Sequence, residues 1–165
     1  IMMNKILYIS ALGLVFLLFQ ILLSDFLVIR GIRPDFMLIL ILYISFKFGS
    51  LNGVILGFSL GILEDLISSG SLMGLSSLTK SISGFLIGRL KGKYYTMSPI
   101  TFHFLWFSIL LLHFFIYVYF NYQSVLESNS LVFWNTYFYV TIYTLVFFLL
   151  FQLINPVSSL KPQEK

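Results

Sequence analysis

Four glycines recur at intervals of four residues within one apolar segment, at Gly49, Gly53, Gly57 and Gly61, and an acid, Asp65, follows at the same interval. Residues four apart lie on one face of an α-helix, so the spacing predicts a ridge without side chains, about 24 Å long, that ends in a carboxylate. An interior glycine destabilises a helix in water by up to about 1 kcal/mol, whereas in lipid such a ridge lets two helix backbones touch. The spacing therefore predicts helices packed closely together in a membrane.

The composition supports a membrane location for nearly the whole chain. Of 165 residues, 59% are hydrophobic and 10% are charged, whereas soluble domains carry roughly 25% charged residues. The chain has no cysteine, which excludes disulfides, thiolate metal sites and cysteine nucleophiles. We interpret the net charge of +4 as a signal of membrane topology and expect no nucleic-acid partner.

Six apolar stretches approach the roughly 20 residues that a membrane-spanning helix needs. They lie at residues 6–23, 34–48, 51–67, 72–90, 97–120 and 131–154. We therefore expect an all-α integral membrane protein with one transmembrane domain, residues 1–155, and a disordered cytoplasmic tail, residues 156–165. The second and third stretches are short and the fourth contains Lys80, so five spans with a re-entrant segment are the alternative.

The basic residues predict the orientation in the membrane. If the N-terminus is cytoplasmic, most basic residues outside the spans lie inside, and only Arg30 and Arg33 lie outside. The residues expected inside are Lys5, Lys47, Arg89, Lys91, Lys93, Lys161 and Lys165. This asymmetry predicts that both ends are cytoplasmic, in a multi-pass membrane protein. Membrane lipid is an expected contact, and headgroup anchoring is one interpretation of Arg30 and Arg33.

A second ladder with the same spacing lies on the next predicted helix, at Lys80, Gly84, Gly88 and Gly92. An antiparallel hairpin centred near Leu72 would bring the two ladders together. The expected pairs are Gly61 with Gly84, Gly57 with Gly88, Gly53 with Gly92 and Asp65 with Lys80. A lysine inside the membrane needs a partner, so we expect an Asp65–Lys80 ion pair, with Glu64 as the other candidate acid. A contact with a partner protein and a buried ligand site are alternative explanations of these charges.

Two further features of the sequence have structural explanations. Pro34 and Asp35 are typical of a helix start, because proline is tolerated at the first helical position and an acid there favours the helix dipole. His103 and His113 are ten residues apart, too far to share a metal without other ligands. We expect both histidines in the core or at an interface, and we expect no metal, cofactor or catalytic site.

The central part of the chain resembles the bacterial rod shape-determining protein MreD family. The resemblance covers about residues 31–93 and is carried by GIRPD at residues 31–35, by GVILGFSLGILEDLISSGSLMGLSSL at residues 53–78, and by SGFLIGRLKGK after it. Its most specific elements are Arg33, Pro34, Asp35, Gly57, Gly61, Asp65, Gly70 and Gly74. Glu64 departs from the apolar residue usual in the family, which leaves open which carboxylate has the family's role.

The resemblance implies a non-enzymatic component, in the bacterial inner membrane, of the machinery that elongates the lateral cell wall. It implies binding to MreC and work with the actin-like MreB, the glycosyltransferase RodA and its partner, a class B penicillin-binding transpeptidase. It also implies a six-helix fold similar to the substrate-binding subunits of energy-coupling-factor transporters. The helices would then organise or regulate the peptidoglycan synthase rather than catalyse a reaction.

Two other functions are alternatives. A substrate-capturing subunit of an energy-coupling-factor transporter would use residues 24–33 as a lid over polar residues near Asp65. The first helix has Ala11 and Gly13 but lacks the Ala-x-x-x-Ala surface typical of such subunits. A membrane enzyme acting on lipids would need an acid, a base and headgroup-binding residues at one interface. Glu64 and Asp65 are only a fragment of such a site.

Overall fold

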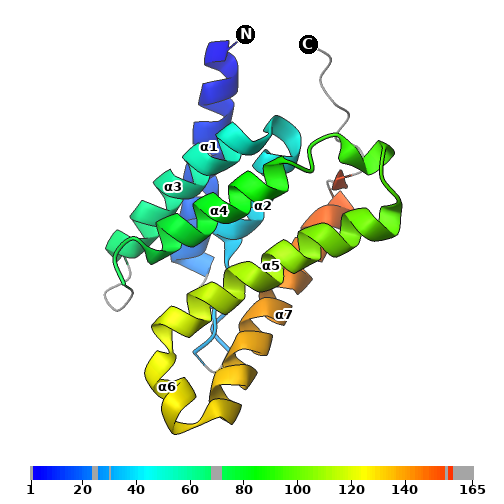
Figure 1. Cartoon of the computed structure of the whole chain (residues 1–165). Coiled ribbons are helices and arrows are strands. Elements are labelled where there is room, and N and C mark those ends of the chain that lie inside the picture. Colours follow the sequence, from blue (N-terminus) through cyan, green and yellow to red (C-terminus); the bar gives the residue numbers. More distant parts are fainter. Residues whose placement is uncertain (1, 24–25, 30, 68–71, 155, 158–165) are drawn as a thin grey trace.

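The computed structural model describes residues 2–23, 26–29, 31–67, 72–154 and 156–157. Over these residues it contains seven α-helices and one short 3-10 helix, arranged as shown in Figure 1. They are α1 (Met2–Leu23), α2 (Phe36–Phe48), α3 (Ser50–Ile67), α4 (Leu75–Gly88), η1 (Lys93–Tyr95), α5 (Pro99–Asn121), α6 (Gln123–Ser128) and α7 (Ser130–Ile154). The long helices match the six expected stretches, and α6 is a short addition between α5 and α7.

The helices are those of a multi-pass membrane protein. By length and composition, α3, α5 and α7 could each cross a membrane, and Ala11–Leu22 and Phe36–Phe48 are shorter apolar helical segments. The helix α4 has only 14 residues and contains the buried Lys80. The arrangement of these helices as six spans stays a prediction.

The helix α2 forms the centre of the molecule. Every residue from Phe36 to Phe46 is buried, as expected for a helix that is apolar on all sides. One face packs with α1 and α3 around Ile41, Leu56 and Leu60. The other packs with α4, α5 and α7 around Leu42, a cluster to which Val157, just after α7, also contributes. The short α2 is thus surrounded mainly by protein.

Two antiparallel helix pairs flank this central helix. The helices α3 and α4 run side by side, and the longer α5 and α7 form the second pair (Figure 1). The first turn of α1 and the last turn of α7 lie toward one end of the molecule, and α6 lies at the other (Figure 1). Which end is cytoplasmic stays a prediction. Arg30, Gly70 and the tail from residue 158 lie outside the described residues.

Candidate functional site

The backbones of α3 and α4 touch at glycines. A Cβ atom on Gly57 would lie 2.7 Å from the carbonyl oxygen of Lys80, and one on Gly53 would lie 2.5 Å from the carbonyl oxygen of Gly84. A Cβ on Gly61 would lie 2.5 Å from the amide nitrogen of Ser77. No side chain fits at these three positions unless a backbone moves. The glycines therefore hold α4, with its Lys80, directly against α3.

The register of this contact differs from the expected one. Gly53, not Gly61, lies opposite Gly84, and Gly57 lies opposite Lys80 instead of Gly88. Gly88 lies against Gly49 and Ser50. The helices are thus shifted by about two turns from the predicted pairing. Ser77, only two residues after the start of α4, already lies against Gly61, six residues before the end of α3, so the hairpin is not centred on Leu72.

Gly49 and Gly92 were expected within the two ladders but lie outside α3 and α4. Gly49 ends α2 with a φ of 92°, and Gly92 lies beyond the end of α4, before η1, with a φ of 72°. Residues with side chains rarely adopt such positive φ angles, so glycine is required here for the backbone conformation. Gly49 still lies against α4: a Cβ on Gly88 would be 2.6 Å from the carbonyl carbon of Gly49.

Asp65 caps the beginning of α4 and does not pair with Lys80 as expected. Its carboxylate accepts hydrogen bonds from the amide groups of Gly74 at 2.9 Å, Ser76 at 3.2 Å and Ser77 at 3.3 Å. The hydroxyl group of Ser77 donates a fourth, at 3.2 Å. These contacts satisfy amide groups that the first turn of a helix leaves without partners. Asp65 thus joins the end of α3 to the start of α4.

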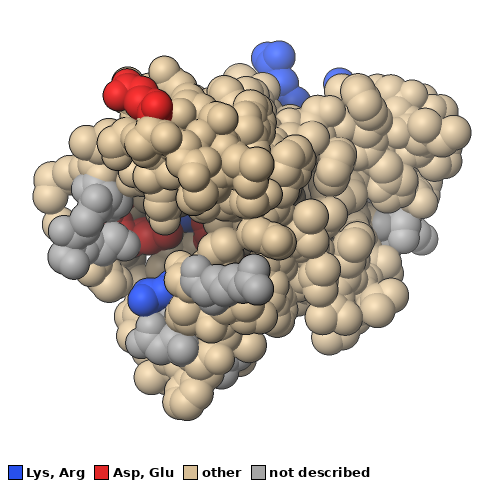
Figure 2. All heavy atoms as spheres, turned by 90° about the horizontal axis from the view of Figure 1, so that it is seen from below, with Lys and Arg blue, Asp and Glu red and all other residues tan. Residues whose placement is uncertain are grey.

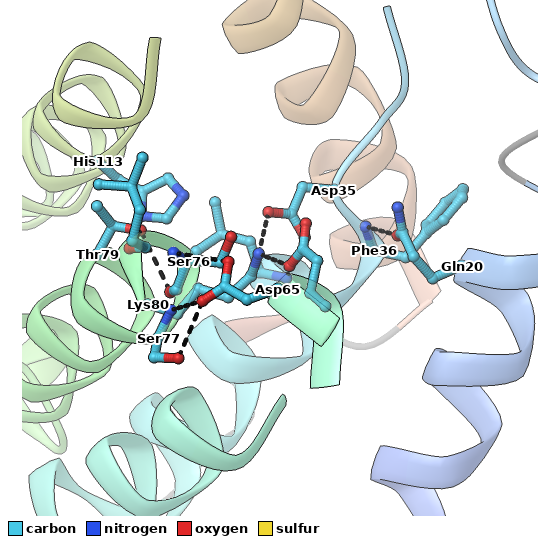
Figure 3. Close-up of polar contacts among 12 residues, drawn as sticks. Gln20, Asp35, Phe36, Asp65, Ser76, Ser77, Thr79, Lys80 and His113 are labelled. Atoms are coloured by element: carbon cyan, nitrogen blue, oxygen red, sulfur yellow. Dashed lines mark hydrogen bonds and ion pairs between the residues drawn. The ribbon is translucent and has the colours of Figure 1, made fainter. Parts of the chain in front are cut away.

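Lys80 lies between two other acids, at the centre of the charged cluster in Figure 3. It is 1% exposed, and its ammonium nitrogen lies 2.7 Å from Oδ2 of Asp35 and contacts Oε2 of Glu64. Pairing with Glu64 was the open alternative for this lysine, but the role of Asp35 was not foreseen. The ion pairs connect the start of α2 with α3 and α4.

Asp35 also sets where α2 begins. Its Oδ1 accepts a hydrogen bond of 2.8 Å from the amide of Leu38, so Asp35 is the N-cap and α2 starts one residue later, at Phe36. Its own amide donates to Oγ1 of Thr144 on α7 at 3.2 Å. The side chain of Gln20 on α1 accepts from the amide of Phe36 at 2.9 Å (Figure 3). Contacts with α1 and α7 thus hold the backbone around Asp35, and α2 binds its carboxylate.

The two histidines lie in separate contacts on α5. His113 is buried, and its Nδ1 lies 3.0 Å from the hydroxyl oxygen of Ser83 on α4, which in turn donates to the carbonyl of Thr79 at 2.8 Å. Nδ1 of His103 accepts a hydrogen bond from the indole of Trp106 at 2.9 Å. No group of three potential metal-ligating side chains occurs among the described residues. The histidines thus have polar partners without a metal.

A cavity of about 280 Å³ lies beside the charged cluster. Asp35 and Glu64 form part of its wall, and Arg33, which is exposed, lines it as well. In Figure 2, acidic and basic atoms are visible inside a hollow on the face that contains the α6 end of the molecule. The site thus combines a buried ion-pair cluster with a cavity that opens at the surface.

A family model for the rod shape-determining protein MreD matches residues 2–157. The chain belongs to the MreD family. It is therefore a rod shape-determining membrane protein, of a family that is non-enzymatic. The match extends beyond the central segment to the outer helices α1, α5 and α7. The comparisons with curated proteins and with solved structures gave no match.

In this MreD-family protein the motif residues meet at one end of the helices. Asp35, at the end of the Arg-Pro-Asp motif, contacts Lys80, while Asp65, at the end of the glycine ladder, caps α4. Glu64, the departure from the family pattern, contacts Lys80 rather than replacing Asp65 as the cap. The neighbouring carboxylates have different roles. Sequence reasoning missed Gln20 and Thr144, and only their polarity within apolar helices could have indicated them.

Proposed function

We propose that this protein is a component of the inner-membrane machinery for lateral cell-wall elongation, where it binds MreC and helps to organise or regulate the peptidoglycan synthase. The observation that carries the proposal is the match to the MreD family over residues 2–157. The further partners are RodA and its class B penicillin-binding transpeptidase, together with MreB, which is bound directly or indirectly.

The polar groups of the site support a role in assembly rather than in a reaction. Lys80 is bound by Asp35 and Glu64, and Asp65 is bound by the start of α4. These contacts hold α2, α3 and α4 in one arrangement. The described outer faces of the long helices are largely apolar, and Leu18 on α1 and Leu149 on α7 are examples. Such faces suit contact with lipid or with the helices of other proteins.

We further propose six spans with both ends in the cytoplasm. The basic residues support this orientation, and so does the position of the first turn of α1 and the last turn of α7 toward one end of the molecule (Figure 1). The cavity beside Asp35 would then open on the outer side of the membrane. Reporter fusions after Lys93 should behave as cytoplasmic, and a fusion at Glu127 as external.

Co-purification with MreC tests the proposed function. The tagged protein is expressed with MreC from the same bacterium, and a membrane protein of the same host with one unrelated helix serves as the control. We expect MreC, and not the control, to remain bound through solubilisation and size-exclusion chromatography. Loss of MreC from a monodisperse, folded preparation would contradict the proposal.

The cavity gives the alternative, substrate capture, a specific observation in its favour. Gly31, Ile32 and Arg33 line it and come from the segment expected to act as a lid. Its volume of about 280 Å³ lies just below the range of about 300–1,000 Å³ typical of small-molecule sites. Native mass spectrometry of the purified protein decides this point. A bound vitamin-sized molecule would favour the transporter, whereas its absence is expected under the proposed function.

A further inference from the structure

A second cavity, of about 470 Å³, lies between η1, the beginning of α5 and the end of α7. The helix α7 forms its apolar wall, with Val146, Leu149, Leu150 and Leu153. These four residues extend over about 10 Å of the helix axis, and the last three of them are exposed. The wall is thus an apolar strip that is open at the molecular surface and suits a hydrocarbon chain.

The polar part of this cavity lies at the ends of the two long helices. His103 comes four residues after the first residue of α5, and Gln152 comes two residues before the last residue of α7. Each therefore lies within about 6 Å of a helix end. Both helices are long and apolar enough to cross a membrane, and the ends of such helices reach the lipid headgroups. The cavity thus joins polar groups at headgroup level to an apolar strip that runs into the membrane.

His103 offers a hydrogen-bond donor whose position is fixed by its neighbour. The indole of Trp106 can only donate, and it donates to Nδ1 of His103 at 2.9 Å. The proton of the imidazole ring therefore lies on the other nitrogen, Nε2. No described residue accepts a hydrogen bond from Nε2, although the ring is exposed and lines the cavity. The Nε2–H group is thus available to an oxygen atom of a ligand.

Two further polar groups border the cavity and form no hydrogen bond with any described residue. They are the side-chain amide of Gln152 and the hydroxyl group of Tyr94. The ring of Tyr94 contacts that of His103, with 6.3 Å between the ring centroids. Amide and hydroxyl groups can both donate hydrogen bonds. Together with His103 they suit a ligand group rich in oxygen, such as a phosphodiester.

The charges around the cavity favour an anion. Three basic residues lie in or just before η1, namely Arg89, Lys91 and Lys93. No described acid lines the cavity, and the sequence has no acidic residue at positions 66–126 or 128–163. Basic residues at a membrane surface attract anionic headgroups. The surroundings therefore favour a negatively charged lipid over a zwitterionic one.

We propose that this cavity binds one anionic glycerophospholipid. Its phosphate accepts hydrogen bonds from Nε2 of His103 and from the amide of Gln152, and its negative charge faces the basic residues beside η1. One acyl chain lies along the apolar strip of α7. A phospholipid combines these oxygen atoms, the charge and the hydrocarbon chain in one molecule. The site does not depend on the binding of MreC, so it goes beyond the proposed function.

Native mass spectrometry of the purified, delipidated full-length protein tests the site. The probes are dioleoyl phosphatidylglycerol, dioleoyl phosphatidylcholine and dioleoylglycerol, which share their acyl chains and differ in the headgroup. We expect one bound phosphatidylglycerol per chain and at least about fivefold weaker binding of the other two probes, the factor that the attraction of a single basic residue gives.

Removal of the donor provides the matched comparison. His103→Phe keeps an aromatic ring and should weaken the binding of phosphatidylglycerol about tenfold, because a hydrogen bond to a charged group is lost. Tyr139→Phe is the control and should leave this binding unchanged. It also removes a polar group from an exposed aromatic residue, but Tyr139 does not line this cavity.

Three results would overturn the proposal. One is equal binding of phosphatidylglycerol and either of the other probes. Another is unchanged binding of phosphatidylglycerol by a folded His103→Phe variant or, if that variant does not fold, by Gln152→Leu, for which we also expect weaker binding. The third is a second copy of the chain retained in place of the lipid, since the apolar strip would then be a contact between two copies.

Discussion

The two helix pairs use the same spacing with side chains of opposite size. On α3 and α4, glycines at intervals of four bring the backbones into contact. On α5, bulky residues at the same interval form the buried face, namely Phe102, Trp106, Leu110, Phe114 and Val118. They pack with buried residues of α7 that include Phe133, Tyr137 and Phe148. One pair is therefore held through its backbone and the other through its side chains.

This difference determines where polar groups can be held firmly. Side chains in a core can repack around a change of shape, whereas two touching backbones have no such freedom. Lys80 lies on the backbone-to-backbone contact, with its carbonyl against Gly57, and its ammonium group reaches Asp35 and Glu64. The glycine pair thus positions the charged cluster, while the aromatic pair forms much of the apolar core.

The largest effect is expected from a side chain placed in the glycine contact. Gly57→Leu should prevent accumulation of folded protein, because even a Cβ there would lie 2.7 Å from the carbonyl oxygen of Lys80. Gly57→Ala should lower stability by at least about 1–3 kcal/mol, the usual range for overpacking. Ile55→Leu is the control, since Ile55 is exposed on the same helix. Normal accumulation of folded Gly57→Leu, measured by size-exclusion chromatography, would show that the backbones of α3 and α4 do not touch at this glycine.

Removal of the buried cation is expected to have the next largest effect. Lys80→Met leaves Asp35 and Glu64 without their shared partner and should destabilise the protein by about 3–5 kcal/mol, as loss of one member of a buried ion pair typically does. Lys93→Met removes an exposed lysine and should change stability by less than about 0.5 kcal/mol. Unfolding in mixed detergent micelles measures both. Similar stabilities for the two variants would show that the cluster does not hold the helices.

Asp65→Asn should cost less, because it weakens the cap of α4 without removing a charge partner. An amide has one acceptor oxygen, so it cannot keep contacts made by both carboxylate oxygens. We expect a loss of about 1–3 kcal/mol, the range for leaving buried donors unsatisfied. Ser76→Ala is the control, since the buried hydroxyl of Ser76 has no hydrogen-bond partner among the described residues. Equal stabilities of these two variants in the same unfolding assay would refute the capping role.

The smallest effect is expected in the aromatic pair. Leu110 is 1% exposed on α5, and Leu110→Met changes its shape while nearly conserving its volume. Such substitutions usually cost less than about 1.5 kcal/mol, so the melting temperature should fall far less than that of Gly57→Ala. A larger fall for Leu110→Met would mean that the side-chain contact tolerates change less well than the backbone contact.

Sequence reasoning identified the helices and the glycine contact, because both follow from local periodicity. It could not fix the register, since sliding one ladder past another by whole turns still leaves small residues facing each other. The register depends on Asp65 reaching the amides of Ser76 and Ser77 across the turn. The contact between Asp35 and Lys80 was not predictable either, because no periodicity links residues so far apart in the chain.

Two double-mutant cycles test most directly whether the glycine contact places Lys80 with Glu64 instead of with Asp65. The free energy of unfolding is measured for Lys80→Met combined with Glu64→Gln and, separately, combined with Asp65→Asn. Residues in one ion pair typically show coupling of about 0.5–3 kcal/mol, whereas independent sites add within about 0.3–0.5 kcal/mol. We predict that the Glu64 double variant loses clearly less than the sum of its single variants, and that the Asp65 double variant loses nearly the sum. Strong coupling to Asp65 with none to Glu64 would contradict the observed register and the charged cluster built on it.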